Sequence, residues 1–191
     1  MNICLYGASS ADIDAKYLDA ARAFGRLLAQ RGHTLVYGGG AQGVMGAAAR
    51  GVTDKGGSII GIAPSFFQVD GILYSGCTEF ITTETMAERK ARMMARADAF
   101  VMAPGGFGTL EEFFEVLTLK QLGKHNPAIA VLNTDGFYDT LQTFVQEAVE
   151  RRFIREACLG LYALCDTPEQ TLAYLEGFDP NALDVRHLKN I

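Results

Sequence analysis

The sequence has few of the residues that build metal sites or disulfide frameworks. Its four cysteines, Cys4, Cys77, Cys158 and Cys165, are scattered along the chain without a Cys-x-x-Cys pair. Such spacing is typical of reduced thiols rather than of disulfides or zinc ligands, and Cys4 falls in an apolar segment expected to be buried. We therefore expect a cytoplasmic protein whose cysteines belong to its core.

Patterns typical of several other protein classes are also missing. No apolar run reaches the about 20 residues of a membrane helix, and no secretory leader precedes the first apolar segment. The formal net charge of −5 argues against a nucleic-acid surface. The isolated histidines His33, His125 and His187 are expected to be ordinary surface residues. Without metal-ligand spacing, a Walker A loop or a lysine in a pyridoxal-phosphate context, we expect no metal and no cofactor.

Glycine, by contrast, is abundant, with 21 residues in a chain of 191. This length favours one domain, which we expect to span residues 1–191 with a polar tail over 177–191. Short apolar segments alternate with amphipathic ones, which predicts a Rossmann-like α/β fold: a doubly wound parallel sheet with helices on both faces. The strands are expected at 2–6, 34–37, 58–63, 80–82, 98–102, 128–132 and 161–165.

Three glycine- or serine-rich loops follow predicted strands, at 7–10, 38–46 and 103–109. In a parallel sheet, loops of this kind meet at the carboxyl edge, where ligands bind. The string Gly38-x-Gly40-x-x-Gly43 matches a dinucleotide fingerprint, but it follows the second strand and lacks the expected acid after the third. We expect this loop to form a wall of the same site rather than to bind a dinucleotide.

The loop Pro104-Gly-Gly-Phe-Gly-Thr-Leu-Glu-Glu112 joins a strand to a helix. Thr109 is predicted to be the N-cap, with Glu112 completing a capping box. Glycine amides at a helix start form an anion site, so we expect bound phosphate there. A capping box needs no ligand, and that simpler interpretation stays open at this point.

The helix predicted over 84–97 has one charged residue that solvation does not easily explain. Glu88 and Arg92 fit an exposed i, i+4 pair. Arg89 instead shares a partly apolar face with Met86 and Met93. Both a cleft-lining arginine and one that extends its stem to reach solvent fit this position.

Two motifs together resemble the LOG ("Lonely Guy") family of cytokinin riboside 5′-monophosphate phosphoribohydrolases, long labelled as possible lysine decarboxylases. These are Met86-x-x-Arg89-Lys90 and Pro104-Gly-Gly-x-Gly-Thr-x-x-Glu112, and the likeness extends to about residue 165. The resemblance implies a Rossmann-like homodimer that hydrolyses the N-glycosidic bond of a nucleoside 5′-monophosphate, with Arg89 and Glu112 as the catalytic pair. The substrate-binding residues then expected are Ser9, Gly39, Gly40, Met86, Lys90, Gly105, Gly106, Phe107, Gly108, Thr109 and Thr118.

The mechanism that follows has two parts. The loop 105–109 would hold the phosphate, while Glu112, kept ionised by the helix end, would face an oxocarbenium-like ribose. Residues 65–79 are expected to form a long loop at the base end of the pocket. They do not resemble the family's usual segment, so AMP and N6-modified cytokinin nucleotides both remain candidates. The alternative function is a non-catalytic nucleotide sensor or carrier, and a dinucleotide oxidoreductase ranks below it.

Overall fold

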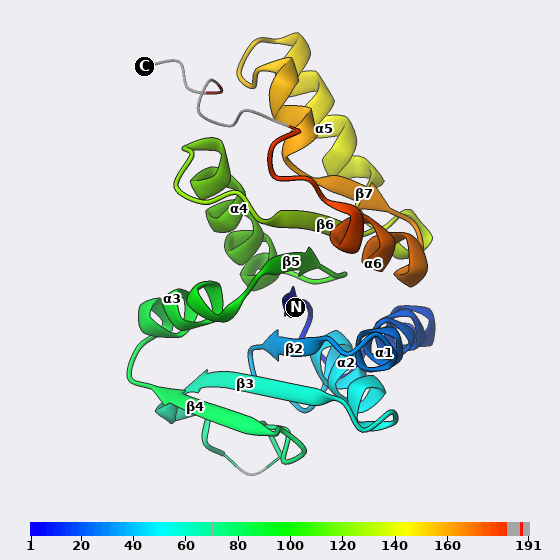
Figure 1. The fold of residues 1–191 in the computed structure, drawn as a ribbon, viewed down its shortest axis with the longest axis vertical. Helices are drawn as coiled ribbons and strands as arrows, with labels where there is room; N and C mark the ends of the chain where they lie inside the picture. Colours follow the sequence, from blue (N-terminus) through cyan, green and yellow to red (C-terminus); the bar gives the residue numbers. More distant parts are fainter. Residues whose placement is uncertain (70, 183–187, 189–191) are drawn as a thin grey trace.

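The computed structural model describes residues 1–69, 71–182 and 188, which form one parallel sheet with helices on both faces (Figure 1). The seven strands lie in the order β4-β3-β2-β1-β5-β6-β7, and every pairing is parallel. This arrangement confirms the predicted fold class. Their bounds are β1 Asn2–Tyr6, β2 Thr34–Tyr37, β3 Ser58–Pro64, β4 Glu79–Thr83, β5 Ala99–Met102, β6 Ala128–Leu132 and β7 Ala163–Cys165.

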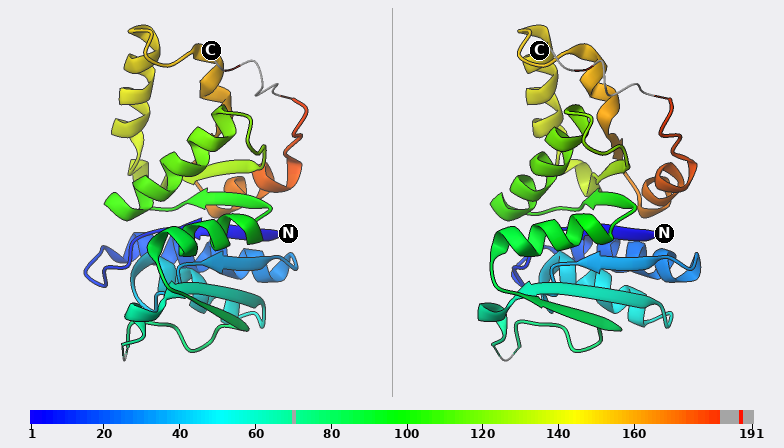
Figure 2. Two further views of the ribbon diagram at one scale, coloured as in Figure 1. Left: turned by 90° about the vertical axis from the view of Figure 1, so that its left-hand side faces the viewer. Right: turned by 60° about the vertical axis from the view of Figure 1, so that its left-hand side comes forward.

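Six α-helices of the described chain cover the two faces of this sheet. They are α1 Ala15–Gln30, α2 Gly43–Thr53, α3 Met86–Arg96, α4 Phe107–Gln121, α5 Asp139–Glu150 and α6 Pro168–Gly177. Helices α1, α2 and α6 pack on one face, and α3, α4 and α5 pack on the other. Figure 2 shows α3 and α4 in front of the sheet when the molecule is turned from the view of Figure 1.

The strands are buried along both faces, which is why their sequences are almost continuously apolar. In β1, Ile3 and Leu5 join the core beneath α1, α2 and α6, whereas Cys4 and Tyr6 join the core beneath α3, α4 and α5. Alternate residues of a strand point to opposite faces, so one short segment supplies both cores.

The order of the strands fixes where a ligand can enter. The chain passes from β1 outward through β2 and β3 to β4, then returns to place β5 on the other side of β1. The direction of winding therefore reverses between β1 and β5. In open α/β sheets a crevice forms at the carboxyl ends of the two strands that flank such a reversal.

Helices α1 and α6 begin directly after a residue whose side chain caps them. Asp14 accepts from the backbone of Lys16 at the start of α1, and Thr167 accepts from Gln170 at the start of α6. The predicted 65–79 loop contains one short 3-10 helix, Ser65–Phe67, and ends where β4 begins at Glu79.

One histidine prediction is wrong. His125 is half-buried against Phe100, its Nε2 lies 2.9 Å from the Val116 carbonyl oxygen, and burial lowers its pKa. It is covered because the connection from α4 to β6 folds back on the sheet. His33 is partly buried and contacts Glu176.

His187 and most of the predicted polar tail lie outside the described residues. Within the part of the chain that the structure describes, no helix is long and apolar enough to cross a bilayer.

Candidate active site

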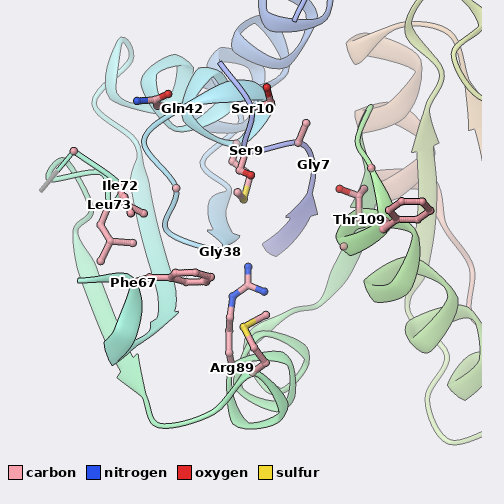
Figure 3. Close-up of a pocket in the computed structure, with 18 residues that line it drawn as sticks. Gly7, Ser9, Ser10, Gly38, Gln42, Phe67, Ile72, Leu73, Arg89 and Thr109 are labelled. Carbon is pink, nitrogen blue, oxygen red and sulfur yellow. The ribbon is translucent and has the colours of Figure 1, made fainter. Parts of the chain in front are cut away.

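A cavity of about 650 Å³ opens at the carboxyl edge of the sheet, beside the point where the winding reverses (Figure 3). Five chain segments line it: the loop after β1, the loop after β2 with the start of α2, residues 67 and 71–73, the first turn of α3, and the first turn of α4. Sequence analysis predicted three of these segments to meet at this edge. The lining residues are Gly7, Ala8, Ser9, Ser10, Gly38, Gly40, Gln42, Met45, Phe67, Gly71, Ile72, Leu73, Met86, Arg89, Gly106, Phe107, Gly108 and Thr109.

Backbone hydrogen bonds join these loops directly to one another. The Ala8 amide donates to the Pro104 carbonyl at 3.0 Å, and the Met45 amide donates to the Ala8 carbonyl at 3.2 Å. Gly43 follows the second loop with a φ of 63°, a conformation that favours glycine. The floor of the cavity is therefore built from main-chain contacts between loops that are distant in sequence.

The start of α4 differs from the prediction. The helix begins at Phe107 with Gly106 as its N-cap, and no side chain caps it. Thr109 lies inside the first turn and is buried, so the predicted capping box of Thr109 and Glu112 is wrong. The cause is the extended backbone of Gly106, whose carbonyl already accepts the first helical bond from the Leu110 amide at 3.0 Å.

With Gly106 at the N-cap, the first amides of α4 have no side-chain acceptor. Helix α2, which also starts at the cavity, likewise has no side-chain cap at Gln42. By contrast, α1, α3 and α6 are capped by Asp14, Thr85 and Thr167. Unpaired amides and the positive end of the helix dipole favour an anion, so the cavity has a phosphate-binding character.

Arg89 is buried in the cavity wall rather than extended toward solvent. Its Nη1 donates to Glu112 Oε1 at 2.7 Å, and its Nε donates to the Ile62 carbonyl at 3.2 Å. In Figure 3 the guanidinium rises from α3 toward Gly38. The structure thus decides between the two interpretations of Arg89 in favour of the cleft.

Glu112 lies behind this arginine. Its carboxyl group is buried and is not part of the cavity lining, whereas Arg89 is. Burial raises the pKa of Glu112, and the charge of Arg89 opposes that rise. The expectation that the helix end keeps the group ionised therefore needs correction: Glu112 sits in the second turn of α4, and Arg89 is the group that favours its charge.

The other predicted site residues divide into three sets. Ser9, Gly40, Met86, Gly106, Phe107, Gly108 and Thr109 line the cavity, while Gly39 and Gly105 are adjacent to lining residues in the chain. The structure does not bring Lys90 or Thr118 to the cavity. Lys90 pairs with Glu111 and Glu115 on α4, and Thr118 is exposed farther along that helix.

Residues 65–79 are expected from the sequence at the base end of the pocket, but the sequence did not predict which of their side chains form its apolar wall. Phe67, Ile72 and Leu73 come from the long 65–78 connection, which is tied to the loop after β2. The Ala41 amide donates to the Ile72 carbonyl at 2.8 Å, and Gly40 forms an isolated bridge with Leu73. The length of this connection indicated a functional segment, but its lack of periodicity gave no sign of which side chains turn inward.

The cavity therefore has two chemically different ends. Figure 3 shows Phe67, Ile72 and Leu73 on the side opposite Thr109, with Arg89 between them. Backbone amides and a guanidinium suit a phosphate and a sugar, and the apolar wall suits a flat base. Among the described residues, no group of three or more histidine, cysteine, aspartate or glutamate side chains could hold a metal ion.

Comparison with known protein families gives a consistent match. The profile of a family described as "Possible lysine decarboxylase" matches residues 45–175. The cytokinin riboside 5′-monophosphate phosphoribohydrolase LOG2 of Arabidopsis thaliana is 40% identical over 178 residues, which cover 93% of this chain and 84% of that protein. The enzyme LOG of Oryza sativa subsp. japonica is also 40% identical, over 93% of this chain and 74% of its own.

Solved structures show the same fold at lower identity. The molybdenum cofactor binding protein of Rippkaea orientalis matches with a TM-score of 0.71 and 20% identity, covering 92% of this chain and 94% of its own. The molybdenum cofactor carrier protein of Chlamydomonas reinhardtii gives 0.70 and 22%, covering 92% and 95%. At this identity the likeness concerns the fold alone.

Proposed function

Because the chain belongs to the family of cytokinin riboside 5′-monophosphate phosphoribohydrolases, we propose that its cavity binds AMP or an N6-modified relative and hydrolyses it to the free base and ribose 5-phosphate. The activity is that of an N-glycosidase. The observation that carries the assignment of the site is Arg89, which lines the cavity beside the uncapped start of α4 and is paired with the buried Glu112 behind it.

The phosphate is proposed to bind at the first turn of α4. The amides of Gly106, Phe107 and Gly108 are available there, and Thr109 adds a hydroxyl to the cavity lining. This binding energy positions the bond that breaks, so a nucleoside without phosphate is expected to be a poor substrate.

Bond cleavage then generates positive charge at the ribose. As the base departs with the electron pair of the glycosidic bond, C1′ becomes oxocarbenium-like. Water adds to C1′ and releases a proton, which balances the proton that the base takes up. We assign Glu112 to the stabilisation of that charge or to the orientation of the water. Since Arg89 lines the cavity and Glu112 lies behind it, the guanidinium is proposed to face the bound nucleotide while its bond to Glu112 favours the ionised form of that acid.

The decarboxylase description of the family profile has no support in this cavity. Pyridoxal-phosphate chemistry needs a lysine that forms a Schiff base. None of the described residues that line the cavity is a lysine. Lys90 is engaged by Glu111 and Glu115, and Lys120 is buried near Pro127.

We also infer a homodimer, supported by apolar side chains left uncovered in one copy. Phe107 is 94% exposed and Phe144 is 65% exposed, and Phe114 on α4 is partly exposed as well. Exposed aromatic residues of this kind are enriched at protein interfaces. Light scattering should give twice the chain mass of 20.7 kDa, and a monomer at micromolar concentration would exclude the dimer.

Product analysis tests the function directly. Purified protein is incubated with AMP, with N6-isopentenyl-AMP and with adenosine, and free base is followed by chromatography. We expect base release from at least one monophosphate and little from adenosine. Calorimetric binding without product would favour the carrier alternative, and neither binding nor release from a panel of monophosphates would refute the proposal.

A further inference from the structure

Gly38, the first glycine after β2, faces the guanidinium of Arg89. A Cβ atom placed on Gly38 would lie 1.9 Å from Arg89 Nη2 and 3.1 Å from its Cζ. Real Cβ contacts are never this short, so no side chain fits here while Arg89 keeps its place.

The backbone does not explain this glycine. Gly39 has a φ of 78°, which favours glycine on conformational grounds, but Gly38 is not among the positive-φ residues. At Gly40 an added Cβ would meet only the flexible end of Met45, at 2.8 Å. Of the three consecutive glycines, Gly38 is therefore the one that leaves room for the arginine.

Arg89 has little freedom to yield. Its Nε is bonded to the Ile62 carbonyl and its Nη1 to Glu112, and the whole side chain is buried. A methyl group at position 38 would force the guanidinium to break at least one of these bonds. Losing the bond to Glu112 would leave a buried carboxyl group without its charged partner, which proteins tolerate poorly.

We propose that Gly38 is a positioning residue: its missing side chain forms the slot that holds the Arg89 guanidinium against Glu112 and Ile62. The proposal that this slot serves catalysis rests on the function proposed above, whereas the slot itself can be tested without substrate. Gly38 acts through Arg89, so its effect should vanish when the guanidinium is removed.

A stability cycle tests the slot. Gly38→Ala is made in the parent protein and in the Arg89→Ala/Glu112→Gln background, which leaves no unpaired buried charge. We expect the thermal midpoint to fall by about 4 °C or more in the parent and by about 1 °C or less in the background. Insolubility of Gly38→Ala that the background relieves also supports the slot. Equal losses, or insolubility in both backgrounds, would overturn it.

An activity cycle tests the positioning. Gly38→Ala and Gly40→Ala are each combined with Arg89→Lys, and kcat/KM for the best monophosphate is measured. Gly38→Ala should lower kcat/KM by about 100-fold in the parent and by less than about 3-fold beside Arg89→Lys. The Gly40→Ala effect should be similar in both backgrounds. If Gly38→Ala lowers kcat/KM by the same factor in the parent and beside Arg89→Lys, as expected for Gly40→Ala, then Gly38 acts on the ligand directly and the proposal fails.

The pH profile supplies a readout that a purely structural defect would not move. With the guanidinium displaced, Glu112 loses the charge that favours its ionised form. The acid limb of kcat/KM should therefore lie at higher pH in Gly38→Ala than in the parent, and an unshifted limb would argue against the proposal. A protein without any hydrolase activity would refute the proposed function, while the stability cycle would still decide on the slot.

Discussion

Glu112 and Arg89 are two residues whose chemistry depends on each other. The carboxyl group is buried, which favours its neutral form, and the guanidinium at 2.7 Å favours its charged form. The ion pair therefore joins α3 to α4 and also influences the ionisation of Glu112.

Substitution of Arg89 or Glu112 should lower activity by more than any accompanying loss of fold stability would explain. Glu112→Gln keeps the size of the side chain but removes its charge, so we expect kcat/KM to fall by about 100-fold or more. Glu115→Gln, on the same helix but outside the cavity, is the matched control and should stay within about 3-fold of the parent. Steady-state assays with purified, folded variants check this, and a fully active Glu112→Gln would contradict the assignment.

The pH dependence of activity should report the raised pKa of Glu112. An ionised carboxylate is present above its pKa and is lost as the pH falls through it, so the acid limb should lie above the ordinary glutamate value of 4.5. Arg89→Ala removes the charge that opposes the rise, so the limb should move to still higher pH. Profiles of kcat/KM between about pH 4 and 8 measure it; a limb shifted downward in Arg89→Ala would contradict this account.

At the scale of elements, the 65–78 connection decides the shape of the base end. Two adjacent phenylalanines, Phe66 and Phe67, stack edge to face there, but only Phe67 lines the cavity. Phe66, immediately before the inward-facing Phe67, is therefore a matched aromatic control.

Phe67→Ala should change the preference between bases. Loss of this apolar surface is expected to lower kcat/KM for N6-isopentenyl-AMP by about 10-fold more than for AMP. Phe66→Ala should leave the ratio of the two values within about 2-fold of the parent. Parallel assays with both substrates measure the ratio; equal effects of the two substitutions would show that the segment does not contact the base.

Across the whole molecule, one buried lysine joins parts that are far apart in sequence. Lys120 on α4 is fully buried, donates to the Pro127 carbonyl at 2.8 Å, and lies 4.4 Å from the ring centre of Phe178. Burial lowers its pKa to about 8. The residue links the end of α4, the connection to β6 and the segment after α6.

This lysine predicts a pH-dependent stability. Its folded pKa of about 8 lies below the ordinary 10.5, so between these values the unfolded chain binds more protons and the protein gains stability as the pH rises. Lys120→Met has no titrating group at this position. Its free energy of unfolding relative to the parent should therefore decrease by up to roughly 3 kcal/mol as the pH rises from about 8 to 10.5. Urea unfolding at several pH values measures the difference, and a constant difference would contradict the buried charge.

Some structural features were available from the sequence because they depend on local chemistry. Apolar segments of strand length predicted all seven strands of the described chain. The two motifs around Arg89 and Glu112 also predicted that these residues belong to one site. Parallel strands bring their carboxyl ends to one edge, so sequence order alone placed the three loops together.

Only the tertiary structure decided how the site is assembled. It started α4 at Phe107 instead of after Thr109, because backbone geometry at Gly106 outweighed the preference for a hydroxyl cap. It placed Arg89 in front of Glu112 and raised the pKa of that acid by burial. Sequence fixes which groups are present and which elements bear them. Burial and the space left beside each group, as at Gly38, depend on segments far apart in the chain and exist only once they have packed.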